Sequence, residues 1–175
     1  MQIARIPDND AARVAALRAY GLDEGIDERR FQDAVDLAAD LFGVPIALIS
    51  LVEDNRQWFK ARVGLEACGT GRDVSFCSHA ILEPGQPLVV SDATRDERFA
   101  DNPLVTGSPN IRFYAGQPLV NPEGHALGTL CLIDTVPRGL DQALTRQLDR
   151  LGRMVMNMIL VRSRQRGGDE DRAAA

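Results

Sequence analysis

The sequence predicts an α+β fold in which a central antiparallel sheet of five to six strands has terminal helices packed on one face. Short apolar stretches separated by Asp, Asn, Gly and Pro fill the middle of the chain, as in strands joined by turns. Apolar residues at helical spacing lie before and after them. The 175 residues, 45% apolar and 26% charged, suit one globular domain with helical extensions.

Two helices are expected before the first strand. Asp10 can cap the first helix, which ends at Gly21. The second helix spans about residues 28–41 and is closed by Gly43. Its apolar residues form one stripe, which consists of Phe31, Ala34, Val35, Ala38, Leu41 and Phe42. We expect this stripe to cover the sheet.

The strands follow as one hairpin and three later segments. Residues 45–52 are apolar on both faces, so this strand should be covered on both sides. Asp54 and Asn55 can turn the chain into a return strand at residues 57–63. The remaining strands are expected at residues 87–91, 112–119 and 127–133.

A short helix and a long loop are expected on the sheet face opposite the terminal helices. Ser75 is a good N-cap for a helix over residues 76–82. Residues 92–110 are rich in Pro, Gly, Asp and Asn, which predicts a loop with one helical turn near residues 95–99. Long loops inside compact domains often bind ligands.

A long helix is expected over residues 139–164, followed by a disordered polar tail at residues 165–175. Alternating spacings of four and three give its apolar residues an a/d heptad seam. The seam consists of Leu144, Leu148, Leu151, Val155 and Met158. Because Met154, Ile159 and Leu160 widen this apolar surface, we expect the helix to contact both the sheet and a second copy of the chain, forming a homodimer.

Charge and composition argue against several classes of partner. The net charge is -5 and the basic residues are scattered, so no nucleic-acid contact is expected. No apolar run approaches the roughly 20 residues that span a bilayer, and no signal peptide follows Met1, so no membrane contact is expected. Three cysteines without framework spacing favour a reducing compartment, and we expect a cytoplasmic protein.

Three motifs dominate the second half of the chain: SFCSHA at residues 75–80, FYAGQPL at residues 113–119 and GTLCLID at residues 128–134. By the order and spacing of these motifs, and of matching runs upstream, the chain resembles a GAF domain. GAF domains are small-molecule sensor modules of bacterial signalling proteins. The resemblance covers about residues 7–162.

The resemblance implies a non-enzymatic sensor. It divides the chain into a helical extension at residues 1–26, a GAF core at 27–138, the helix at 139–164 and the tail at 165–175. A pocket would lie between the sheet and the helix that begins at Phe76, and a bound ligand would shift the terminal helices. The signal would pass to a separate protein such as a histidine kinase or a diguanylate cyclase, unless the sequence is a piece of a longer protein.

Eight residues are expected to contact the ligand: Trp58, Phe76, Cys77, His79, Asp92, Phe99, Tyr114 and Asp134. The aromatic members would supply apolar walls, and an anionic or carbonyl group of the ligand would face the amides that open the helix at Phe76. Structural alternatives stay open for all of them. Cys77 could be a small buried hydrophobe, and His79 could bond to a neighbouring loop. The aromatic rings could fill the core, and the two aspartates could cap turns.

The identity of the ligand stays open. Cys77 and His79 do not share a helix face, so no metal site is expected. Ser78 separates them where bilin-binding members of the family have adjacent Cys and His, and only 5% of the residues are aromatic, so no bilin is expected. The Asn-Lys-containing signature of cyclic-nucleotide-binding members is also missing from the sequence.

Two alternative functions stay open. GAF-type reductases of free methionine sulfoxide use a thiolate and a resolving cysteine, and Cys68 and Cys77 are similarly placed. However, residues 101–103 lack the cysteine that those enzymes also need, and no nucleophile has a visible base and orienting group, so we expect no catalysis. The other alternative is a dimerisation scaffold whose pocket has collapsed.

Overall fold

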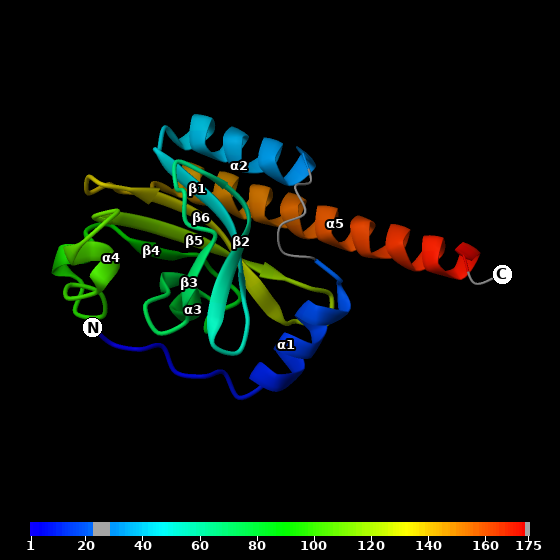
Figure 1. Ribbon diagram of the computed structural model, residues 1–175. Helices are drawn as coiled ribbons and strands as arrows, with labels where there is room; N and C mark the ends of the chain where they lie inside the picture. The colour runs from blue at the N-terminus through cyan, green and yellow to red at the C-terminus, as the bar shows by residue number, and fades with distance from the viewer. Residues whose placement is uncertain (23–28, 174–175) are drawn as a thin grey trace.

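The structure is a computed structural model that describes residues 1–22 and 29–173. Over those residues the chain forms one six-stranded antiparallel sheet in the order β3-β2-β1-β6-β5-β4, which confirms the predicted α+β fold (Figure 1). The strands are β1 Ile46–Val52, β2 Arg56–Val63, β3 Gly69–Gly71, β4 Leu88–Val90, β5 Phe113–Val120 and β6 Ala126–Asp134. The α-helices are α1 Asp10–Ala19, α2 Arg29–Phe42, α3 Phe76–Ala80, α4 Pro103–Thr106 and α5 Gln142–Ala173.

Strand β1 runs through the middle of the sheet and is buried along its whole length, as its apolar sequence predicted. Because side chains alternate along a strand, Ala47, Ile49 and Leu51 join the core under the helices. Ile46 and Leu48 join a second core on the opposite face. The sheet therefore separates two apolar layers.

Helices α2 and α5 cover one face of the sheet, side by side (Figure 1). The α2 stripe packs as predicted except at Leu41, which is 46% exposed. At 100° per residue, position 41 lies about 75° from the centre of the other stripe residues, so its side chain leaves the interface. The boundary expected between residues 26 and 27 lies outside the described residues.

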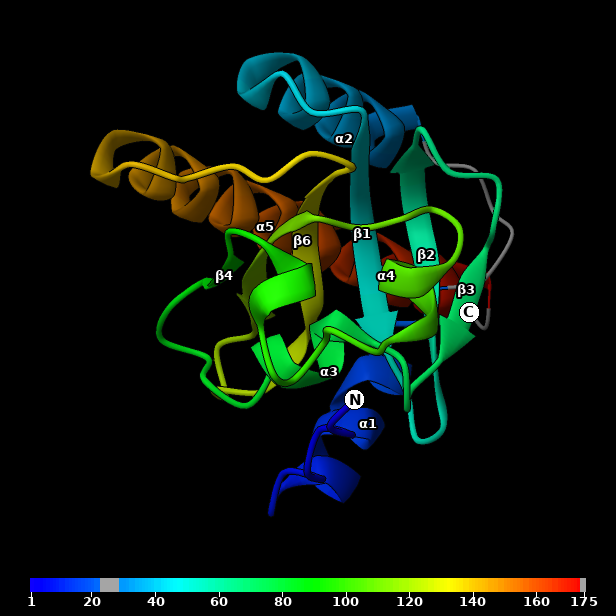
Figure 2. The same cartoon turned by 90° about the vertical axis from the view of Figure 1, so that its left-hand side faces the viewer.

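The opposite face carries α3, α4 and the long segment between β4 and β5 (Figure 2). This segment is more regular than the expected loop. A 3-10 turn, η1, spans Ala93–Arg95, where Asp92 accepts hydrogen bonds from the amide and hydroxyl of Thr94. The helical turn expected near residues 95–99 follows it, since the amides of residues 99 and 100 both donate to the Asp96 carbonyl at 2.9 Å. Helix α4 follows, capped by Asn102, whose side chain accepts from the Leu104 amide.

Helix α5 differs from its predicted bounds at both ends. It begins after Asp141, whose carboxylate accepts from the Leu144 amide, rather than at residue 139. It continues to Ala173, so residues 165–173 of the tail that we expected to be disordered are helical. Gln, Arg, Glu and Ala in this stretch are good helix formers, and they offset two glycines. The C-terminal part of α5 extends beyond the sheet in Figure 1.

Strand β3 was not predicted from the sequence. Its residues, Gly69–Gly71, show no apolar alternation, and two of the three are glycine, which is depleted in strands. Strand β3 forms because the backbone pairs with β2, with Gly69 opposite Trp58. A side chain at residue 69 would overlap the backbone of Gln57, so glycine permits this close approach.

Candidate functional site

A cavity of about 420 Å³ lies between the sheet and the layer that contains α3 and α4. Its floor is formed by β1, β2 and β6, through Ile46, Leu48, Phe59 and Ile133. Helix α3 supplies Phe76 and Cys77, β5 supplies Tyr114, and residues 64–67 and 104–111 contribute to the rim. Small-molecule sites commonly have about 300–1,000 Å³, so the volume suits a compact organic ligand.

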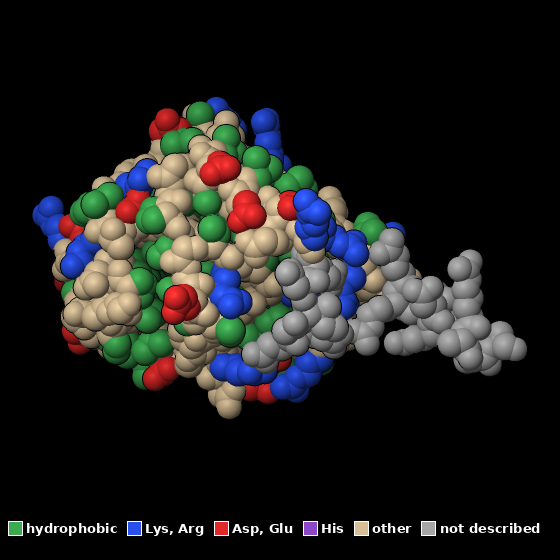
Figure 3. Space-filling model, turned by 45° about the horizontal axis from the view of Figure 1, so that its top comes forward, with side chains coloured by type: hydrophobic (Ala, Val, Ile, Leu, Met, Phe, Trp, Pro, Cys, Tyr) green, Lys and Arg blue, Asp and Glu red, His purple; other side chains and the backbone are tan. Residues whose placement is uncertain are grey.

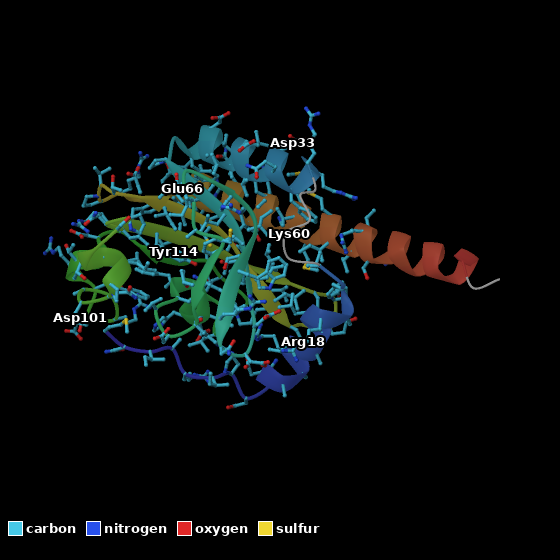
Figure 4. All side chains as sticks on the ribbon, viewed as in Figure 1. Arg18, Asp33, Lys60, Glu66, Asp101 and Tyr114 are labelled. Carbon is cyan, nitrogen blue, oxygen red and sulfur yellow. The ribbon has the colours of Figure 1, made fainter. Side chains whose placement is uncertain are left out.

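The cavity has few polar groups, and its buried amide side chain, Gln57, is already engaged. Gln57 accepts hydrogen bonds from Ser50 and Ser75 at 3.0 and 2.7 Å, and it donates to Thr70 at 2.8 Å. Among the described residues that line the cavity, none is Lys or Arg. Glu66 is an exposed lining residue, and Figure 4 places it in the same half of the molecule as Tyr114. The sequence suggested a ligand with an anionic or a carbonyl group, and this lining favours the neutral of the two.

Two thiols and a phenol meet at one side of the cavity. The Sγ atoms of Cys77 and Cys131 are 3.4 Å apart, and the Tyr114 hydroxyl donates to them at 3.4 and 3.7 Å respectively. Thr129 Oγ1 lies 2.8 Å from Cys131 Sγ. All four side chains are buried, but only Cys77 and Tyr114 line the cavity. Cys131 lies behind them, within the sheet.

This cluster separates the acidities of the two thiols. Burial by itself would raise the pKa of Cys77, but hydrogen bonds with Cys131, Thr129, Tyr114 and Ser50 lower that pKa to about 6. The pKa of Cys131 is raised by burial and by the neighbouring Cys77 thiolate. Burial and the same charges raise the pKa of Tyr114, so its hydroxyl keeps the proton that it donates. The hydrogen bonds of the cluster therefore favour ionisation of Cys77 over Cys131.

Three of the eight predicted ligand residues line the cavity: Phe76, Cys77 and Tyr114. Phe99 lies outside the lining and stacks on Phe76, with ring centroids 3.9 Å apart. It supports the wall without forming it. Helix α3 begins after Ser75 as predicted, since the Ser75 hydroxyl accepts a hydrogen bond from the Ser78 amide at 3.0 Å.

The structure places the other four predicted residues away from the cavity. Trp58 points to the face covered by the helices, because its neighbour Phe59 faces the cavity and side chains alternate along β2. His79 bonds through Nε2 to the Gln2 carbonyl at 3.0 Å. Asp92 caps η1, and Asp134 forms an ion pair with Arg138 beyond the end of β6. These four side chains therefore fit the structural alternatives left open above: Trp58 fills the core, and the other three make hydrogen bonds or ion pairs away from the cavity.

Several lining residues were missed in the sequence, among them Leu48, Gln57, Phe59, Leu104 and Ile111. The alternation in β1 and β2 placed Leu48 and Phe59 on one face, but it could not say which face had a cavity. No group of three or more His, Cys, Asp or Glu side chains suited to a metal occurs in the described part of the chain. No helix within residues 1–22 and 29–173 is long and apolar enough to cross a bilayer.

The sequence model of the GAF domain matches residues 28–159. The chain belongs to the GAF domain family. This GAF domain is 46% identical over 155 residues to the cyclic di-GMP phosphodiesterase PA2567 of Pseudomonas aeruginosa. The match covers 87% of the chain and 26% of that protein, so the chain spans about a quarter of the length of its relative.

Solved GAF structures share the fold at low sequence identity. The GAF domain of the Acinetobacter phosphoenolpyruvate-protein phosphotransferase superposes with a TM-score of 0.62 at 16% identity, covering 90% of this chain and 98% of that one. The free methionine-R-sulfoxide reductase of Neisseria meningitidis, solved with its substrate, superposes with a TM-score of 0.63 at 16% identity. The match covers 94% of this chain and 98% of that one. A domain of a Sinorhizobium meliloti histidine kinase superposes with a TM-score of 0.60 at 16% identity. The match covers 85% of this chain and 99% of that one.

Proposed function

We propose that this GAF domain is a non-enzymatic regulatory module that binds a small, neutral and largely apolar molecule in the cavity. The observation that carries the proposal is the cavity of about 420 Å³, which apolar side chains line and few polar groups enter. A collapsed dimerisation scaffold would not need this space. In a protein built like the Pseudomonas relative, the bound molecule would regulate hydrolysis of cyclic di-GMP by an output domain.

The lining supports this choice of ligand chemistry. A phosphate or carboxylate needs a cationic side chain or several free donors when it is buried. The polar side chain deepest in the lining, Gln57, already uses its amide in three hydrogen bonds. A cyclic nucleotide would therefore lose the water that hydrates its phosphate, and the lining would not supply hydrogen bonds in place of that water.

A chain of hydrogen bonds connects the cavity wall to helix α1. The Ser75 amide and the Ser78 hydroxyl, at the start of α3, both donate to the Arg72 carbonyl at 3.2 Å. The Arg72 guanidinium donates to Asp10, the first residue of α1. A ligand that binds one arrangement of α3 more tightly would therefore bias the position of α1.

The test is to fill the cavity while leaving the fold intact. Leu104 lines the cavity and is half-buried, so the indole in Leu104→Trp can extend into the space. Native mass spectrometry of the protein purified from its source cells should show a bound small molecule. We expect this variant to reduce affinity about tenfold or more, which corresponds to roughly 1.4 kcal/mol.

The matched control is Leu41→Trp, which makes the same change on the exposed surface of α2. This variant should keep the ligand, and both variants should show a cooperative thermal transition. A wild-type protein without any bound molecule, or equal retention of the molecule by both variants, would contradict the proposal. In a full-length phosphodiesterase, Leu104→Trp should also remove the ligand's effect on cyclic di-GMP hydrolysis.

A second candidate is thiol-dependent reduction of free methionine sulfoxide, and the position of Cys77 in the cavity wall together with its lowered pKa favours it. The structural neighbours from Thermoplasma acidophilum and Neisseria meningitidis are named as such reductases. Their identity to this chain is 12% and 16%, which supports the fold alone. Steady turnover with a thiol reductant, abolished in Cys77→Ser, would favour this candidate over the regulatory one.

A further inference from the structure

Cys77 and Cys131 come from distant parts of the chain and meet under the cavity. Cys77 lies in the first turn of α3 and Cys131 in the middle of β6. Their sulfurs are 3.4 Å apart without a covalent bond. A disulfide is about 2.05 Å long, so the sulfurs need to approach by only about 1.4 Å.

Gly116 leaves the space that completes this cluster. It lies opposite Cys131 in the pairing of β5 with β6, and two residues after Tyr114 on the same face of β5. A Cβ atom at residue 116 would overlap the Tyr114 hydroxyl. The glycine thus allows the phenol to lie across its own strand and donate to both sulfurs.

We propose that Cys77 and Cys131 form a dithiol redox switch, in which a hydroperoxide entering the cavity is reduced and the two cysteines become a disulfide that ties α3 to β6. The two thiols have different roles. Cys77 lines the cavity, so it can meet the oxidant. Cys131 is 0% exposed and reaches only the other sulfur and its hydrogen-bonding partners, so it acts as the resolving thiol.

The chemistry balances in two steps. The Cys77 thiolate attacks one oxygen of the hydroperoxide, ROOH. An S–O bond forms, the O–O bond breaks, and the leaving alkoxide takes up from solvent the proton that Cys77 released on ionising, which gives ROH. Cys131 then attacks the oxidised sulfur, so that an S–S bond forms and the S–O bond breaks. Hydroxide leaves with the Cys131 proton as water. Overall, two thiols and ROOH give a disulfide, ROH and water.

The pKa values agree with this order, since Cys77 has the lowered pKa and Cys131 the raised one. The bond would also draw Cys77 away from the cavity and toward the sheet. Because α3 is bonded to Arg72, the disulfide and a bound ligand would act on the same wall. The switch itself needs no ligand, so it can be tested independently of the proposed regulatory function.

The experiment treats the reduced, folded protein with stoichiometric hydrogen peroxide or cumene hydroperoxide. Intact mass should fall by two hydrogen atoms, and peptide mapping should find Cys77 joined to Cys131. Cys68→Ser removes the exposed third cysteine and should give the same product. In Cys131→Ser the reaction should stop at a sulfenic acid on Cys77, which dimedone traps.

A buried serine could prevent folding, so Cys131→Ala and Cys77→Ala are made as well. Far-UV circular dichroism tests whether each variant is folded. Cys77→Ala should consume no peroxide beyond the amount that Cys68 accounts for. The proposal is wrong if Cys77 stays unmodified in the folded wild type, or if oxidation joins it to Cys68. Neither outcome bears on the bound mass that tests the regulatory function.

Discussion

Asp10 holds two buried arginines together at the start of α1. Its carboxylate accepts from Arg13 Nε at 2.8 Å and from the two terminal nitrogens of Arg72 at 2.7 and 2.9 Å. Burial would raise the pKa of Asp10, but hydrogen bonds from Arg72 and Arg13 outweigh it and lower the pKa below 3.8. This single carboxylate therefore joins α1 to the segment that precedes the cavity wall.

We predict that Asp10→Asn lowers the free energy of unfolding by about 3–5 kcal/mol at pH 7, because it leaves two cations buried without a counter-charge. Since the folded-state pKa is lowered, the stabilisation is present above about pH 3.8 and is lost as the pH falls through the folded-state value. The difference between the wild type and this variant should therefore shrink below pH 4. Urea unfolding at pH 7 and below pH 4 measures this difference in the free energy of unfolding.

Asp33→Asn is the matched control, because Asp33 forms an ion pair with Arg29 at 3.9 Å in which both side chains are exposed (Figure 4 labels Asp33). It should change the stability by less than about 1 kcal/mol at either pH. If Asp10→Asn behaves like this control, the buried carboxylate does not organise α1.

The pairing of β1 with β6 leaves no room for a side chain at residue 128. Gly128 lies opposite Leu51, and a Cβ atom at residue 128 would overlap the Ser50 carbonyl oxygen. The neighbouring Ser50 side chain is buried and donates to Gln57, so neither strand can easily move aside. Because residue 128 has no side chain, β6 can pair with β1, and the sheet stays continuous between its two apolar layers.

Gly128→Ala should destabilise the protein by about 3 kcal/mol or more, because backbone atoms rather than a flexible side chain would have to move. Gly139→Ala is the control, since nothing lies within 4 Å of the added methyl group. The control should be neutral or more stable by up to about 1 kcal/mol, through the smaller entropy of the unfolded chain. Thermal unfolding compares the two. Equal melting temperatures would show that the two strands are free to separate.

At the scale of the whole molecule, α5 both completes the domain and extends beyond it (Figure 1). Leu148 and Val155 are 0% exposed and belong to the core under the helices, so they cannot contact a second copy as the predicted seam required. The apolar surface that remains accessible is displaced around the helix. It consists of Leu151, Met154, Met158 and Val161, again at spacings of three and four.

The surface over α2 gives no comparable stripe. Figure 3 shows positive, negative and apolar side chains interspersed on that side of the molecule. Leu37 and Leu41 are its exposed large apolar residues among those described. These two lie four residues apart and form one small pair rather than a stripe. Between the two helices, α5 is therefore the better candidate for contact with another copy.

We predict a homodimer through this α5 stripe. Met154 and Val161 are 40% and 47% exposed, so Met154→Glu combined with Val161→Glu should leave the domain folded and convert dimers into monomers. Leu148→Ala should instead cost about 2–5 kcal/mol of stability without changing the subunit number. Light scattering and chemical unfolding separate these effects. A wild type that is already monomeric at high concentration contradicts the predicted dimer.

The sequence by itself determined the fold class, because strand and helix periods are local properties of neighbouring side chains. The apolar run from Ile46 to Val52 required cover on both faces, and the capping residue Ser75 located the short helix beside the cavity. The motifs around Cys77 and Tyr114 identified the family and three of the cavity residues. No pairing partner was needed for these inferences.

Only the tertiary structure decided which face of the sheet carries a cavity, and so whether Trp58 or Phe59 could meet a ligand. It also turned α5 so that Leu148 faces the sheet, and it brought Cys131 to within 3.4 Å of Cys77 across 54 residues of chain. The physical reason is the same in each case. Periodicity fixes which side chains share a face, whereas the burial and neighbours of that face depend on how distant elements pack.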